Sequence, residues 1–160
     1  MTNPLNKKLG SVRLARIDAE MGPGANGSGG SLDVDVKLAL SEIVDGKNTA
    51  TVSVSAKGIP KGADESGFAF RISITGAALW EWMGDIPSKD ALEQDSMLYE
   101  LCTPIYTLIV SEVSRVALGL GFPGVSLSWS LGEGSEPKPQ KKKTTAASRP
   151  KRTTRSTSKA

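Results

Sequence analysis

The residue types that most often carry catalysis or bind metals are scarce in this sequence. It has 160 residues, with one cysteine, Cys102, and no histidine. Without histidine there is no imidazole to act as a general base, and one cysteine cannot form a zinc cage or an internal disulfide. Asp33 and Asp35 lie two residues apart on one face of a predicted strand, with no histidine to partner them, so we interpret them as a solvated face. The composition argues against an enzyme and against a metal or other cofactor.

A glycine-rich stretch over residues 22–31 is the other candidate for ligand chemistry, because such loops can wrap phosphate groups. It lacks a Gly-Lys-Ser/Thr ending, and no helical pattern follows it to supply an N-terminal dipole. We therefore interpret it as a plain loop. Cys102 falls on the apolar face of a predicted helix, where it is expected to pack rather than react.

The expected compartment is the cytoplasm. A lone thiol suits a reducing environment, and residues 1–9 carry no apolar stretch of the kind found in a secretory signal. No run of apolar residues reaches the length of a membrane span, so an integral membrane protein is not expected.

Charge divides the chain into two parts. The net charge is +3, yet residues 137–160 contain nine basic residues and no acidic one, which leaves residues 1–136 acidic. We predict a disordered basic tail over residues 132–160. The basic clusters of this tail, which form a predicted electrostatic site, are Lys141, Lys142, Lys143, Lys151 and Arg152. The tail either binds nucleic acid through phosphate contacts or acts as a general electrostatic tether, and it has no aromatic residue for base stacking.

Alternation of apolar and polar residues predicts four strands, joined by short connections as in an antiparallel meander. The first strand changes phase near Arg16, as a β-bulge would require. A turn over residues 44–47, in which Gly46 tolerates a positive φ, joins the second strand to the third. The four predicted strands cover residues 11–21, 32–41, 49–56 and 68–75.

A helical period of 3.6 residues follows, with Ser88 as a predicted N-cap and an apolar stripe that runs to about Leu118. Pro104 interrupts this stripe. Either the helix is kinked there, or Thr103 caps a second helix that has Pro104 at its first position. Trp80 and Trp82 precede the helix in a predicted loop, as a binding surface or as a lid over the sheet edge.

These elements predict an α+β domain over residues 11–131, in which a four-stranded antiparallel sheet packs on a long helix, after a flexible N-terminus of residues 1–10. A helix about 10 Å wide covers only about two strands, so the remaining apolar rows need another polypeptide. Val36, Leu38 and Leu40 are either ordinary core or part of such a contact surface.

Four features of the sequence occur together: the strand at 36–40, the order of four strands and then a helix, the helical residues 98–102, and the Gly-Phe-Pro break at 121–123 before an extended 125–127. In these features the chain resembles the SecB family of export chaperones. The resemblance implies an ATP-independent holdase that binds unfolded polypeptides, and a homo-oligomer built as a dimer of dimers. The client-binding residues that it implies are Val36, Leu38, Leu40, Leu120, Phe122, Val125 and Leu127.

The resemblance also implies partners. SecB proteins dock on the SecA motor through a metal-binding tail and through acidic residues on the sheet, but the tail here has no cysteine or histidine. Asp18 matches one acidic position, whereas the corresponding site in the fourth strand is Arg71. A dedicated chaperone that accompanies a toxin–antitoxin protein is the other variant. The competing hypothesis is an oligomeric, nucleic-acid-associated structural protein that binds through its tail.

Overall fold

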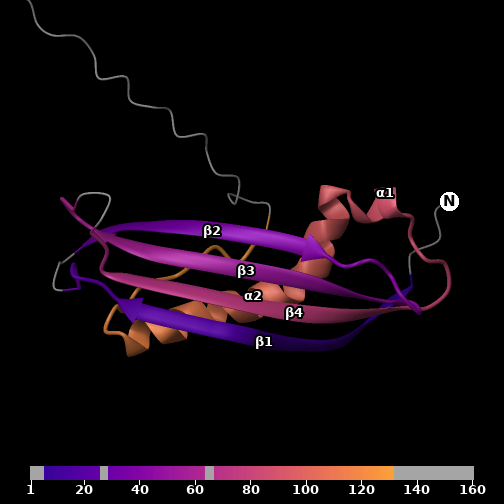
Figure 1. The fold of residues 1–160 in the computed structure, drawn as a ribbon, viewed down its shortest axis with the longest axis horizontal. Helices are drawn as coiled ribbons and strands as arrows, with labels where there is room; N and C mark the ends of the chain where they lie inside the picture. Colours follow the sequence, from indigo (N-terminus) through magenta and orange to yellow (C-terminus); the bar gives the residue numbers. More distant parts are fainter. Residues whose placement is uncertain (1–5, 26–28, 64–66, 132–160) are drawn as a thin grey trace, which may run out of the picture.

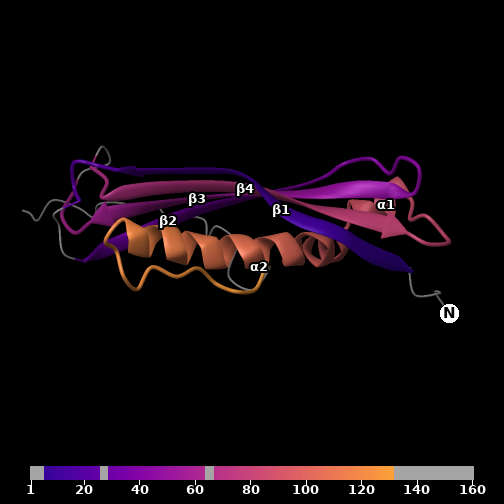
Figure 2. The same cartoon turned by 90° about the horizontal axis from the view of Figure 1, so that it is seen from below.

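A computed structural model describes residues 6–25, 29–63 and 67–131, which form one antiparallel sheet with a long helix against one of its faces (Figures 1 and 2). The predicted fold class is confirmed, and the predicted tail over 132–160 lies outside the described residues. The elements are β1 (Lys7–Met21), β2 (Gly30–Leu40), β3 (Lys47–Pro60), β4 (Phe70–Trp82), α1 (Lys89–Leu92) and α2 (Asp95–Gly119).

The strands lie in the order β1-β4-β3-β2. The predicted meander holds for β2, β3 and β4, but β1 pairs with β4 across the sheet and not with β2, its neighbour in sequence. The strand β1 also begins at Lys7, earlier than the predicted start at Ser11. This order places β3 and β4 in the centre, and it makes β1 and β2 the two edge strands.

The hairpin between β2 and β3 forms at the predicted turn. Asp45 and Gly46 both have positive φ values, 52° and 71°. Val44 and Lys47 exchange backbone hydrogen bonds of 2.9 and 3.0 Å across the turn. Two consecutive positive φ values give the twist that suits a two-residue hairpin, and Asp-Gly is a preferred sequence for it.

The predicted bulge in β1 is confirmed as a register shift between Leu14 and Arg16. Because of the shift, Ile17 lies opposite Ile74 and Met21 opposite Phe70, on the side of the sheet that carries Leu14. The bulge therefore keeps the apolar residues of β1 on one face although their spacing in the sequence changes.

The hydrophobic core lies between α2 and the two central strands. Alternate residues of β3 and β4 are buried from Ala50 to Ala56 and from Phe70 to Trp82. The buried helix residues facing them include Leu101, Ile105, Ile109 and Val113, at the spacing of one helix face. By length and mean hydropathy α2 alone among the described helices would fit a membrane span, but this apolar stripe is packed on the sheet.

Trp80 and Trp82 belong to β4 and are buried, so the prediction that they lie in a loop is wrong. The Trp80 indole N–H donates to the carbonyl oxygen of Leu101 at 2.9 Å, and that of Trp82 donates to Oδ1 of Asn48 at 2.9 Å. Since β4 pairs with both β1 and β3 along its whole length, it continues well beyond its predicted end at Thr75.

The helical segment breaks after Leu92 and not at Pro104. Ser88 caps α1 as predicted, because its Oγ accepts the Ala91 N–H at 3.2 Å. The second helix, α2, runs continuously through Pro104, so a helix that starts at Pro104 is the wrong alternative. A proline removes one helical N–H donor, which a helix held on a sheet by a full apolar face can tolerate.

Some apolar side chains of the two edge strands remain exposed to solvent. On the helix side of the sheet, Ile17 and Met21 of β1 are 43% and 55% exposed, and Val34 of β2 is 38% exposed. This finding confirms the prediction that one helix is too narrow to hide four strands.

Candidate functional site

A groove of about 510 Å³ lies at one end of the sheet. Three parts of the chain form its walls: the start of β2, the end of β3 with the start of β4, and the loop that follows α2. The lining residues are Gly29–Leu32, Gly58–Pro60, Ala69, Phe70 and Gly121–Ser126. None of them carries a charged side chain, so the groove suits an apolar ligand.

Two aromatic rings form one wall of the groove. Phe70 and Phe122 pack with their ring centroids 4.7 Å apart and their planes tilted by 44°. Phe70 is buried and its ring lies over the backbone of Gly58, where a Cβ would be only 2.4 Å from the ring. Tilted aromatic pairs of this kind are favourable, so the wall is a preformed surface.

The third part of the lining is the chain that turns back after α2 and that carries Phe122. The N–H of Phe122 donates to the carbonyl oxygen of Ala117 at 2.9 Å, which fixes the turn. The chain then returns along α2 on the side of β2 (Figures 1 and 2), where Leu127 is buried and the Tyr106 hydroxyl donates to the carbonyl oxygen of Ser128 at 2.8 Å. This segment is irregular, although its sequence alternates as in a strand.

Of the client-binding residues predicted from the sequence, Phe122 and Val125 line the groove. Leu120 and Leu127 lie beside it and pack against the core. The three predicted residues of β2 lie farther along that strand, half-buried against the core, and do not line the groove; they are Val36, Leu38 and Leu40.

Sequence reasoning missed the contributions of Leu32, the residues 58–60 and Phe70. The sequence favours Phe70 as a core aromatic over a client contact, because nothing local connects it with Phe122. The glycine-rich sequence at 29 and 30 predicts a loop. The position of this loop beside residues 121–126 depends on how the chain packs after α2.

One backbone edge of β2 is open beside the groove. In the described part of the chain, β2 pairs with β3 on one side and with no strand on the other. The pairing with β3 runs from Gly30 to Leu40 without a bulge, so the free edge is a regular row of N–H and C=O groups. Such an edge can pair with an extended peptide.

The described residues contain neither an exposed thiol nor a cluster of metal-binding side chains. Cys102 is buried, and burial raises the pKa of its thiol to about 11, so the reactive thiolate is scarce at neutral pH. Within residues 6–25, 29–63 and 67–131, no three His, Cys, Asp or Glu side chains gather as a metal site would require.

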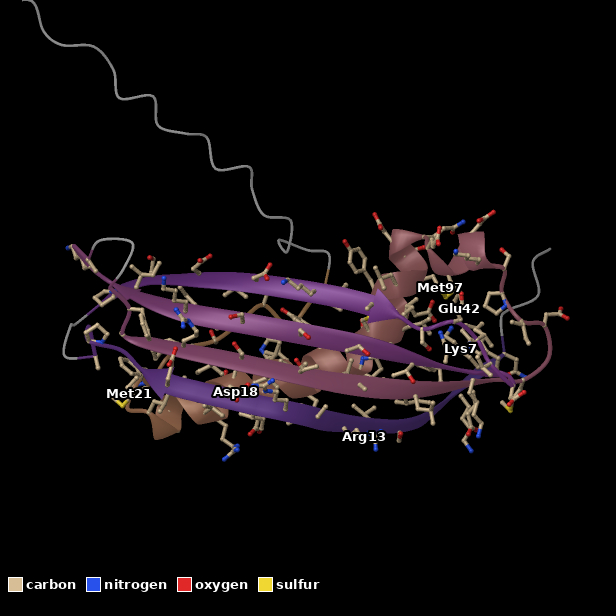
Figure 3. The ribbon with its side chains drawn as sticks, viewed as in Figure 1. Lys7, Arg13, Asp18, Met21, Glu42 and Met97 are labelled. Atoms are coloured by element: carbon tan, nitrogen blue, oxygen red, sulfur yellow. The ribbon has the colours of Figure 1, made fainter. Side chains whose placement is uncertain are left out.

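The predicted electrostatic residues lie away from the groove or outside the described chain. Asp18 is on the face of the sheet turned away from α2 (Figure 3), where its carboxylate pairs with Arg16. The tail cluster of Lys141, Lys142, Lys143, Lys151 and Arg152 falls in the part of the chain that the structure leaves undescribed.

The order of the strands and the long helix behind them define a SecB-like fold. The chain is similar to the SecB-like chaperone Rv1957 of Mycobacterium tuberculosis, solved in complex with a ChAD peptide from the HigA1 antitoxin. The TM-score is 0.58 and the identity 15%, over 76% of this chain and 88% of that one.

A protein of unknown function from Streptococcus agalactiae is also similar, with a TM-score of 0.51 and 12% identity, over 79% of this chain and 99% of that one. No protein-family model matches the chain, and no curated protein matches it. At these identities the likeness shows the fold alone.

Proposed function

We propose that this protein is an ATP-independent holdase chaperone that binds extended, apolar segments of unfolded polypeptides. The observation that carries the proposal is the uncharged groove of about 510 Å³ beside the open edge of β2. Ligand pockets are typically about 300–1,000 Å³ in volume, so the groove is large enough to take apolar side chains of a client. An extended client can place such side chains in the groove while its backbone pairs with the strand edge.

The mechanism requires no covalent chemistry. A client segment that occupies the groove is withdrawn from aggregation by mass action, and it is released when the client folds or passes to another partner.

Because the chain outside its tail is acidic, clients with basic character are favoured. The lone buried Cys102 is compatible with a cytoplasmic site of action.

A dedicated client of the toxin–antitoxin kind is the favoured partner. The similar chaperone from M. tuberculosis is bound to an antitoxin peptide, which supports this class. SecA is the less favoured partner, because bases lie beside the acids of this face and leave no uniformly acidic patch: Asp18 pairs with Arg16, and Arg71 donates to Glu20 at 2.8 Å.

The first test is whether the purified full chain suppresses aggregation. We expect it to lower the light scattered by a chemically unfolded substrate diluted into buffer without ATP, because client segments enter the groove faster than they meet one another. The measurement is turbidity against chaperone concentration, with serum albumin as the control protein. No protection at one assembly per substrate molecule would contradict the proposal.

For the proposed homo-oligomer, the edge strand β1 offers a candidate contact. Ile17 and Met21 are about half exposed on the helix side of β1 (Figure 3 labels Met21), and Leu118 near the end of α2 is 63% exposed. Helix α2 contacts β1, so these exposed side chains come from neighbouring elements. Open apolar surface of this kind is typical of an interface between subunits.

We expect the double variant Ile17→Asp with Met21→Asp to shift the assembly to a smaller mass, because an interface would bury two carboxylates without partners. Multi-angle light scattering on a sizing column gives the mass directly. Val44→Asp is the matched control, since Val44 is 64% exposed in the β2–β3 turn, outside this surface. An unchanged mass in a folded double variant would place the contact elsewhere.

A further inference from the structure

The face of the sheet turned away from α2 is polar and has a regular arrangement of charge. Cross-strand pairing places residues of all four strands in rows, and Figure 3 looks onto this face, with Asp18 and Arg13 labelled on β1. Four successive rows, written from β2 to β1, are Asp33-Lys57-Arg71-Glu20, Asp35-Ser55-Ser73-Asp18, Lys37-Ser53-Thr75-Arg16 and Ala39-Thr51-Ala77-Arg13.

The two middle rows carry charged residues only at the edges of the sheet. One has an aspartate at each edge, Asp35 and Asp18, and the next has a base at each edge, Lys37 and Arg16. All four edge side chains are more than half exposed. Among the described residues of one molecule, each acid pairs with the base two residues along its own strand, Asp35 with Lys37 and Asp18 with Arg16.

The centre of these rows is made of small hydroxyl residues. Ser53 bonds to Thr75 at 2.9 Å, and Ser55 to Ser73 at 3.3 Å, so the hydroxyl groups have partners within the sheet. Short side chains in the centre allow another sheet to approach to about the 10 Å of ordinary face-to-face packing. The longer charged side chains at the edges can then reach across the gap.

We propose that this face binds the same face of a second copy of the chain, with the strands of the two copies antiparallel across the contact. A two-fold axis between the two middle rows, parallel to them, places the acidic row of each copy over the basic row of the other. Asp35 then faces Lys37 of the second copy, and Asp18 faces Arg16. The rows on either side add Glu20 opposite Arg13.

The charge pattern also selects this orientation against the other face-to-face arrangement. With the axis along the strands, Asp35 would face Asp18 of the second copy and Lys37 would face Arg16, so every edge contact of the two middle rows would repel. The antiparallel orientation brings opposite charges together at the edges of the two middle rows, whereas the parallel orientation brings like charges together there. The contact is separate from the apolar surface of β1 and α2, and it does not depend on the holdase proposal.

The test is the mass of the full chain as a function of salt, measured by sedimentation velocity at about 20 mM and about 500 mM sodium chloride. We expect a species of twice the mass of the basal assembly at low salt and its loss at high salt, because exposed ion pairs are screened. The basic tail could also give salt-dependent association, so charge variants must identify the face.

The reversal variant Asp18→Arg with Asp35→Lys makes both middle rows basic, and we expect it to weaken the stacked species at least about tenfold. The swap variant adds Arg16→Asp and Lys37→Asp, which restores a self-complementary pattern with the signs exchanged. We expect the swap variant to associate with itself but not with the wild-type chain, in which its acidic row would face an acidic row.

Both variants keep the tail, the groove and the apolar surface of β1. Equal association of the wild type, the reversal variant and the swap variant would assign the salt effect to the tail and overturn the proposal. The absence of the heavier species from the wild type at low salt would overturn it as well. Co-sedimentation of the swap variant with the wild type would contradict the proposed orientation.

Discussion

Val125→Asp in the wall of the groove is expected to lower the affinity for an unfolded client by at least about tenfold, because a client would bury the new carboxylate without a partner. Val125 lines the groove and is only partly buried in the free protein, so the carboxylate stays hydrated until a client binds. The measurement is the fluorescence anisotropy of a labelled apolar peptide titrated with each variant.

Two further variants make this result specific to the groove. Val44→Asp introduces the same charge at a valine that lies outside the groove, and it should leave peptide affinity unchanged. Ser126→Trp fills the groove from an exposed position at its rim and should weaken binding without removing any core contact. Full affinity in folded Val125→Asp and Ser126→Trp proteins would show that clients bind elsewhere.

Gly76→Ala is expected to destabilise the protein by about 1–3 kcal/mol through overpacking. A Cβ at Gly76 would lie 2.4 Å from Cδ1 of Ile105 and 3.1 Å from the carbonyl oxygen of Arg13. Ile105 is fully buried in the middle of α2, so its contact with Gly76 sets how closely the helix approaches the sheet. Urea denaturation followed by circular dichroism measures the change in the free energy of unfolding.

A matched glycine and a compensating variant test the cause. Gly119 lies in the last turn of α2 with open space around its Cβ position, so Gly119→Ala should be neutral or stabilising by up to about 1 kcal/mol. Ile105→Val in the Gly76→Ala background should recover part of the lost stability, because it removes the methyl group that clashes. A Gly76→Ala protein as stable as the wild type would mean that α2 can move away from the sheet without loss.

The same close contact explains one limit of prediction from the sequence. Gly76 interrupts the alternation of the fourth strand, so a local pattern gives no reason to extend that strand beyond Thr75. In the structure a Cβ at this glycine would meet the side chain of Ile105 in α2, and β4 continues past the glycine to Trp82. The two tryptophans thereby move from a predicted loop into the core.

The groove shows the same limit for a binding site. Phe122 and Val125 were predicted because the break after the helix resembles a SecB feature, and both line the groove. Their partners, Phe70 and Leu32, are more than fifty residues away along the chain. A contact over that separation leaves no periodic signal in either segment, so the sequence could supply only one wall of the groove.

The sequence by itself determined the features that depend on neighbouring residues: the Asp-Gly hairpin, the bulge near Arg16, the Ser88 cap, the apolar stripe of the long helix and the shortage of catalytic groups. Only the tertiary structure decided that β1 pairs with β4, which rows α2 covers, and which charges of the outer face share a row. Turns, caps and periodicity arise from interactions within a few residues, so the local sequence is enough to predict them. Strand order and the pattern of surface charges depend on packing between segments that are far apart in the sequence. The energies of these contacts can be judged only from the folded chain.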